Sequence, residues 1–164
     1  MADFDMKPLK WAKTIPSMAS IQSESEKRKE IAAAKNRKNE RIFEMGQAWQ
    51  LKGKKLDDAR NVVKCDGNDL TDEEFRFFKN GFMYMPRTYA FSYGKKGIKI
   101  DELPKDYTKD KDFMDSYIEG CGFKLGYDGA NALSLPTELV QNKKFLSGYK
   151  KGIEAKAKES SKRR

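Results

Sequence analysis

Residues 70–81 read Leu-Thr-Asp-Glu-Glu-Phe-Arg-Phe-Phe-Lys-Asn-Gly and contain the clearest helix start in the chain. Thr71 has the side chain of an N-cap, and Glu74, three residues later, completes a capping box. Acidic residues fill the first turn, where the positive end of the helix dipole favours them. The stretch therefore predicts a helix that starts at Thr71 and continues through Phe78 to about Gly81.

The end of this stretch has an aromatic-x-x-Gly spacing, Phe78–Gly81, that recurs at Tyr117–Gly120 and Tyr149–Gly152. On a helix, the glycine leaves a gap beside the aromatic residue where a neighbouring helix can approach closely. Glycine inside a helix costs about 1 kcal/mol relative to alanine, so its repeated use indicates a packing role. Chance recurrence in a chain rich in glycine and aromatic residues is the alternative.

The remaining segments predict further helices around this one. Ser23 and Glu26 have capping-box spacing, which predicts Ser23 as the N-cap of a helix that runs to about Leu51. A second helix is expected over residues 54–65, a turn at 66–68, and a last helix from about Thr137. Tyr89, Phe91 and Tyr93 alternate before a Gly-Lys-Lys-Gly turn, which indicates a β-hairpin. We therefore predict a mainly α (α+β) fold. Its parts are an irregular arm at 1–21, a helical domain at 22–155 with a hairpin near 87–100, and a basic tail at 156–164.

Charge is distributed unevenly along the 164 residues. The whole chain has a net charge of +9, whereas residues 1–60 have +5, residues 61–142 have −3 and residues 143–164 have +7. Two basic ends predict a polyanionic partner, because lysine and arginine contacts with phosphates release counterions. Solvated helix faces would explain the same charges without any partner.

The predicted polyanion contacts lie on the first half of the long N-terminal helix and on the last helix. They are Lys27, Arg28, Lys35, Arg37, Lys38, Arg41, Lys143, Lys144, Lys150 and Lys151. Tyr89, Phe91 and Tyr93 would share one face of the predicted strand and form a base-stacking platform. The alternative, which we favour, places these aromatic side chains in the core.

The C-terminal part resembles ribosome modulation factor, a small bacterial family built from two short helices. The shared elements are Gly126-Tyr127 on one helix, Pro136 in the connection, and Phe145-Leu-Ser-Gly-Tyr-Lys-Lys-Gly on the other. In the family, the first helix carries a Gly-Tyr-x-x-Gly element and the second an aromatic-Leu-x-Gly-aromatic element. The resemblance implies docking on ribosomal RNA, and therefore RNA rather than DNA as the nucleic acid.

No residue pattern indicates catalysis or metal binding. The chain has no histidine, which removes the commonest general base and the Ser-His and Cys-His systems. Cys65 and Cys121 lie far apart without a CxxC motif, so no zinc site is predicted. Residues 66–75 resemble part of an EF-hand loop, but Val62 and Lys64 would then occupy ligand positions. We expect no enzymatic activity, no cofactor and no metal.

The N-terminus has no apolar core typical of a signal peptide, and no apolar run is long enough to span a membrane. Together with two unpaired cysteines, these features predict a cytoplasmic protein without a membrane partner.

Two functions fit the sequence. The first is a non-enzymatic accessory protein, associated with nucleic acid or the ribosome, that binds a polyanion through its basic helices. The alternative is a protein-binding module, such as a phage-encoded modifier or inhibitor of a host enzyme, that contacts an acidic protein surface. The first predicts a steep dependence of affinity on salt, and the second predicts contacts through exposed aromatic side chains.

Overall fold

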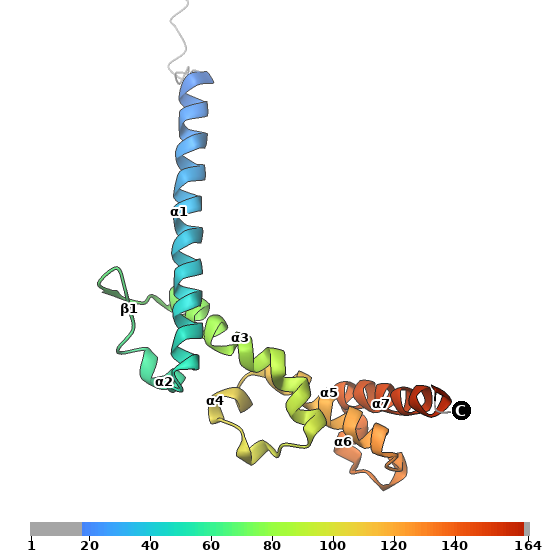
Figure 1. Ribbon diagram of the computed structural model, residues 1–164. Helices are drawn as coiled ribbons and strands as arrows, with labels where there is room; N and C mark the ends of the chain where they lie inside the picture. Colours follow the sequence, from blue (N-terminus) through green and yellow to red (C-terminus); the bar gives the residue numbers. More distant parts are fainter. Residues whose placement is uncertain (1–17, 163–164) are drawn as a thin grey trace, which may run out of the picture. The chain divides into compact units, whose positions relative to one another are not determined.

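The computed structural model describes residues 18–162, and it describes side chains from residue 22 onward (Figure 1). Contacts divide the chain into two units, one that ends at Lys38 and one that runs from Asn39 to Arg164. The first helix, α1, spans Met18–Leu51 and contributes to both units. Residues 1–17 of the predicted arm lie outside the described residues, whereas residues 18–21 are helical.

The predicted N-cap at Ser23 is wrong, because Ser23 lies inside α1. An N-cap residue has extended rather than helical backbone angles, so a serine with helical neighbours on both sides cannot serve as one. The predicted end of this helix at Leu51 is confirmed, and Gly53 follows it with a φ of 67°. Glycine adopts this left-handed conformation without steric cost, which is why the helix ends there.

After α1 come the helix α2 (Leu56–Ala59) and a small antiparallel hairpin made of β1 (Lys64–Cys65) and β2 (Asn68–Asp69). Asp66 and Gly67 form its turn, with φ values of 54° and 81°. Asp-Gly favours two-residue hairpin turns with positive φ at both positions. The predicted turn is confirmed, but the helix predicted over 54–65 is only four residues long, because the chain turns into the hairpin.

The helix α3 spans Asp72–Lys96 and starts with the predicted capping box. The amide of Glu74 donates to Thr71 Oγ1 at 3.3 Å, and the amide of Thr71 donates to Glu74 Oε2 at 2.9 Å. The helix does not end near Gly81, as predicted, but continues past Pro86 to Gly97, which is left-handed. The hairpin predicted near 87–100 is therefore wrong, and the only hairpin among the described residues lies at 64–69.

Two similar segments complete the chain. The first contains η1 (Ile100–Glu102), α4 (Lys105–Thr108) and α5 (Lys111–Asp128), and the second contains η2 (Ala132–Ser134), α6 (Thr137–Gln141) and α7 (Lys143–Lys162). The last long helix starts at Lys143 rather than near Thr137. Asn142, which has an extended backbone, separates α6 from α7 and caps α7. The segment predicted as a basic tail from residue 156 is helical as far as Lys162.

Glycines allow close approach of the long helices at three successive crossings within the described residues. In each crossing, two aromatic-x-x-Gly segments meet: Phe43–Gly46 with Phe78–Gly81, Phe91–Gly94 with Tyr117–Gly120, and Phe123–Gly126 with Tyr149–Gly152. A Cβ on any of the six glycines would lie 1.9–2.2 Å from the carbonyl oxygen of the opposing aromatic residue. The packing role predicted for Gly81, Gly120 and Gly152 is confirmed, and Gly46, Gly94 and Gly126 share it.

The second and third crossings belong to a repeat whose equivalent residues are 32 positions apart. Seven residues of the first copy recur unchanged in the second copy. Those of the first copy are Phe91, Gly94, Gly97, Pro104, Phe113, Tyr117 and Gly120. Their equivalents are Phe123, Gly126, Gly129, Pro136, Phe145, Tyr149 and Gly152. Helix α7 has Glu154 and Lys158 where α5 has Gly122 and Gly126. The glycines that α5 presents to α7 are therefore not repeated on α7.

Aromatic side chains dominate the core along these crossings. The largest fully buried side chains are Phe78, Phe113, Phe145, Ile42 and Met83. Stacked pairs four residues apart recur within the helices, with ring centroids 6.3 Å apart for both Phe113–Tyr117 and Phe145–Tyr149. The second unit is thus held together by repeated glycine contacts with aromatic rings packed around them.

Candidate functional site

The outward side of α7 carries six exposed lysines. They are Lys143, Lys144, Lys150, Lys151, Lys158 and Lys162. At 100° per residue they lie within an arc of about 120°, along about 28 Å of helix. Phe145, Gly148 and Gly152 are buried on the opposite side, against α5. We call these six residues the lysine face.

Local contacts fix the rotation of α7 and hence the direction of this face. Asn142 Oδ1 accepts hydrogen bonds from the amides of Lys144 and Phe145, at 2.9 and 3.2 Å, and so caps the helix. Tyr149 Oη donates to the carbonyl of Ala130 in the preceding loop. With these anchors and the buried glycines on one side, the lysines necessarily occupy the other.

One member of the lysine face has an intramolecular partner. Lys151 Nζ lies 2.5 Å from Glu119 Oε1 on α5, and Ser147 Oγ donates to the same oxygen at 3.0 Å. The hydrogen bond from Lys151 is the main reason why the pKa of Glu119 is lowered from its ordinary value, and the positive charge of Lys144 contributes. Lys151 therefore has a structural role that Lys143 and Lys150 do not share among the described residues.

The structure brings together the four basic residues predicted on the last helix and adds two that the sequence analysis missed. The sequence predicts a tail that contains Lys158 and Lys162, but both residues belong to α7. Lys144, Lys151 and Lys158 follow one another at intervals of seven residues, which places them on one side of a helix. This spacing was the available signal, and the lack of large apolar residues after Ile153 concealed it.

The basic residues predicted on α1 fall into both units. Lys27, Arg28, Lys35, Arg37 and Lys38 belong to the first unit, and the residues from 22 to 37 are exposed. Arg28 lies 4.0 Å from Glu24, one turn earlier in α1.

Arg41, in the second unit, forms two hydrogen bonds with Asp66 at the hairpin turn, at 3.3 and 3.4 Å. It therefore holds the turn of the hairpin against α1.

The base-stacking platform predicted from Tyr89, Phe91 and Tyr93 is wrong. All three lie in α3, where residues two positions apart are rotated by about 200° around the helix axis and so lie on nearly opposite sides. Phe91 packs edge-on against Phe123 at 5.7 Å and Tyr93 packs against Phe113 at 6.3 Å, whereas Tyr89 is half exposed. The core alternative is correct for Phe91 and Tyr93 but not for Tyr89.

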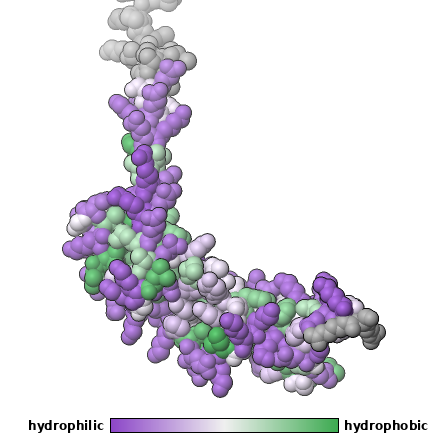
Figure 2. Space-filling model, in the orientation of Figure 1, coloured by the Kyte–Doolittle hydropathy of each residue, from purple (hydrophilic) through white to green (hydrophobic). Residues whose placement is uncertain are grey.

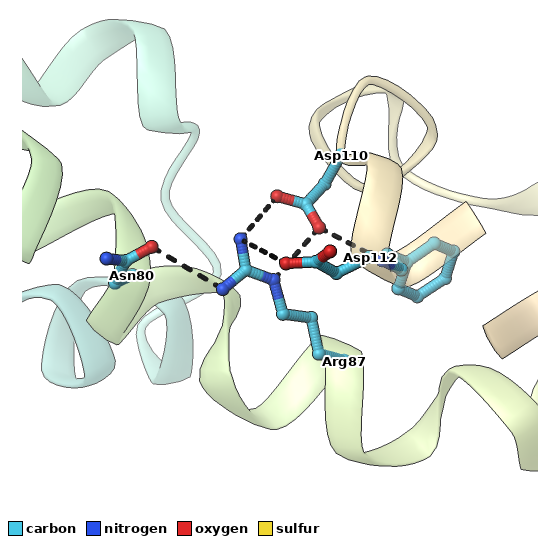
Figure 3. Close-up of polar contacts among 5 residues, drawn as sticks. Asn80, Arg87, Asp110 and Asp112 are labelled. Atoms are coloured by element: carbon cyan, nitrogen blue, oxygen red, sulfur yellow. Dashed lines mark hydrogen bonds and ion pairs between the residues drawn. The ribbon is translucent and has the colours of Figure 1, made fainter. Parts of the chain in front are cut away.

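A buried ion pair, which the sequence analysis did not anticipate, joins α3 to the start of α5 (Figure 3). Arg87 donates to both carboxylate oxygens of Asp110, at 2.7 and 2.9 Å, and Asp110 is only 5% exposed. Burial alone would raise the pKa of Asp110. The hydrogen bonds from Arg87 and the amide of Phe113 outweigh burial and hold this pKa below its ordinary value.

This pair is a structural anchor rather than a reactive site. Asp110 is also the N-cap of α5, because its Oδ1 accepts from the amide of Phe113 at 3.0 Å. Arg87 additionally lies 3.8 Å from Asp112 and donates to Asn80 at 3.4 Å. Each charged group is satisfied by a partner that holds two helices together.

Among residues 22–162, no group of three or more acidic, cysteine or histidine side chains is arranged to hold a metal ion. None of the helices in the described part of the chain is long and apolar enough to cross a membrane. No protein-family model matches the chain, and no curated protein or solved structure matches it significantly.

Proposed function

We propose that the protein is a non-enzymatic accessory protein that binds nucleic acid, RNA in preference to DNA, through the lysine face of α7. The single observation that supports this is the gathering of six exposed lysines on one side of one helix. Such a surface has the charge and length to contact several phosphates along a nucleic-acid backbone. The exposed basic residues of α1 supply a second positive segment, in the first unit.

The internal repeat supports a role outside folding for these lysines. In α5, the positions equivalent to Lys144 and Lys150 hold Asp112 and Ile118. Helix α5 nevertheless makes the same kind of glycine crossing as α7. Since the crossing forms with acidic, apolar or basic residues at these positions, packing alone does not require lysine there.

The proposed contact predicts a steep dependence of affinity on salt. If the six lysines contact six phosphates, affinity for an RNA duplex should fall about a thousandfold between 50 and 200 mM salt. Replacing Lys143, Lys144, Lys150 and Lys158 with glutamine leaves two lysines and should reduce the fall to about tenfold. Lys151 is retained because it pairs with Glu119. Fluorescence anisotropy with labelled duplexes of RNA and DNA measures both slopes.

The matched control replaces Lys96, Lys99, Lys105 and Lys111 with glutamine. These four lysines are also exposed, but none lies on α7, and the variant loses the same net charge. It should keep nearly the full salt dependence of the parent. Equal slopes for both variants would show that binding follows net charge rather than the lysine face. Absence of binding at 50 mM salt would contradict the proposed function.

A further inference from the structure

An apolar groove of about 260 Å³ lies in the second unit, away from α7. Its apolar lining comes from the second half of α1, from the residue before β1 and from α3. These residues are Met45, Ala48, Trp49, Val63 and Phe78. Two exposed lysines, Lys52 and Lys64, complete the lining.

The walls of the groove are held in place by the core. Phe78 is fully buried and Val63 is 7% exposed, so neither side chain is free to fill the groove. Trp49 Nε1 donates to the carbonyl of Lys55 at 2.9 Å, and its ring meets Phe78 edge-on at 6.2 Å. These contacts hold Trp49, Val63 and Phe78 in place as walls of the groove.

Two exposed apolar side chains, Leu51 and Val62, are sequence neighbours of residues that line the groove. Leu51 is 74% exposed and Val62 is 63% exposed, and they adjoin Lys52 and Val63 in sequence. Figure 2 shows hydrophobic surface gathered over α2 and the segment that follows it. An extended ligand such as a peptide would cover this surface, which a small molecule inside the groove would leave exposed to water.

The charges around the groove are mainly positive. Lys52 and Lys64 line it, Lys54 Nζ lies 4.2 Å from the centre of the Trp49 ring, and Lys55 follows directly in sequence. The carboxylate of Asp69, 3.6 Å from Lys64 Nζ, is the only acidic partner of these lysines among the described residues. An occupant with negative charge beside an apolar side chain would be complementary to both properties of the site.

We propose that this groove binds a short acidic segment of a partner protein, which inserts one leucine or aromatic side chain between the lysines. A nucleobase is a poorer occupant, because apolar walls would leave its ring nitrogens and exocyclic groups without hydrogen-bond partners. The site is separate from the lysine face, so this proposal does not depend on nucleic-acid binding. It makes the chain an adaptor with one surface for a polyanion and another for an acidic peptide.

The test uses the full chain labelled with ¹⁵N and follows the indole N–H resonance of Trp49, which a Trp11→Phe variant distinguishes from that of Trp11. The probe is the peptide acetyl-Glu-Asp-Leu-Phe-Glu-Glu-amide. Two control peptides replace its acids with lysine or its Leu-Phe pair with Ser-Ser. We expect the probe to shift the Trp49 resonance saturably at micromolar to millimolar concentration, with both controls at least tenfold weaker.

Two variants locate the binding. Ala48→Phe fills the groove and should abolish the saturable shift, whereas Ala157→Phe makes the same change on exposed α7 and should not. Thermal unfolding of both variants shows whether each is folded. Equal binding of the basic peptide, unchanged binding to Ala48→Phe, or a short RNA that shifts Trp49 as strongly as the probe would each overturn the proposal. So would the absence of any saturable shift.

Discussion

The crossing of α3 with α5 and the crossing of α5 with α7 share their packing residues but differ in their charges. In both, a tyrosine hydroxyl donates to a carbonyl in the loop before the helix: Tyr117 to Ile98 at 2.6 Å, and Tyr149 to Ala130. In both, reciprocal glycines bring the helix backbones into contact. These features depend on shape, and they recur because only glycine permits such close approach.

The polar anchors of the two crossings are different. The first uses the buried pair of Arg87 and Asp110, whereas the second uses the neutral cap Asn142 and a more exposed pair of Glu119 and Lys151. The comparison teaches that backbone contact defines each crossing and that the charges around it can change. This freedom is what allows α7 to carry a lysine face.

Substitution of the glycines is expected to lower the free energy of unfolding the most. It also tests whether the two crossings are equivalent. Gly120→Ala and Gly152→Ala would place a Cβ 2.1 and 2.2 Å from the carbonyl oxygens of Phe91 and Phe123. Each should lower the free energy of unfolding by about 3 kcal/mol, despite the better helix propensity of alanine. Urea denaturation measures both losses.

Gly53→Ala is the control for these variants. A Cβ there meets nothing within 4 Å, but φ is 67°, so the expected loss is only about 1 kcal/mol. A loss for Gly120→Ala no larger than that for Gly53→Ala would contradict the close backbone contact.

Removal of the cationic side chain from each polar anchor should lower the free energy of unfolding by different amounts at the two crossings. Arg87→Met leaves the buried carboxylate of Asp110 without its cation and should cost about 2 kcal/mol. Lys151→Met removes a cation that is 59% exposed and should cost less than about 0.5 kcal/mol. Chemical denaturation of the two variants compares them directly, and equal losses would show that the anchors are equivalent after all.

Removal of an N-cap side chain should lower the free energy of unfolding by a smaller amount, and by a similar amount in different parts of the fold. Thr71→Ala and Asn142→Ala each remove a side chain that accepts a backbone hydrogen bond, and each should cost about 1 kcal/mol. Ser161→Ala, at an exposed position near the end of α7, is the control and should be close to neutral. Thermal melts that leave the cap variants indistinguishable from this control would disprove the assigned caps.

The smallest expected effect is a dependence of stability on pH at the first crossing. The pKa of Asp110 is lower in the folded chain than its ordinary value of 3.8. Its pairing therefore contributes stability at pH values above 3.8, and this contribution is lost as the pH falls through the folded pKa. Asp110→Asn should weaken the fall in unfolding free energy between pH 5 and pH 2, and an unchanged pH profile would contradict the assignment.

Local sequence patterns were sufficient where the interactions that define a structure are local. The capping box at Thr71, the turn at Asp66 and Gly67, and the end of α1 at Leu51 depend on residues only a few positions apart. The helical class and the packing role of glycine also followed from spacing. The same reasoning failed at Gly81 and Gly94, because the sequence cannot distinguish a glycine that ends a helix from one that contacts another helix.

The candidate sites divide in the same way. Four lysines of α7 were assigned from sequence, whereas the end of the lysine face was missed because α7 extends beyond its apolar residues. Neither the pairing of Arg87 with Asp110 nor the groove beside Trp49 had a sequence signal, since their residues come from distant segments.

The sequence by itself determined a mainly helical chain, the start of α3, the turn of the hairpin and a strongly basic C-terminal segment, because propensity, capping and charge are properties of neighbouring residues. Only the tertiary structure decided that α3 continues to Lys96 and which aromatic residues of α3 are buried. It also decided which side of α7 faces outward. The physical reason is that a glycine favours a turn in isolation, but it permits a continuous helix when the backbone of another helix packs against it.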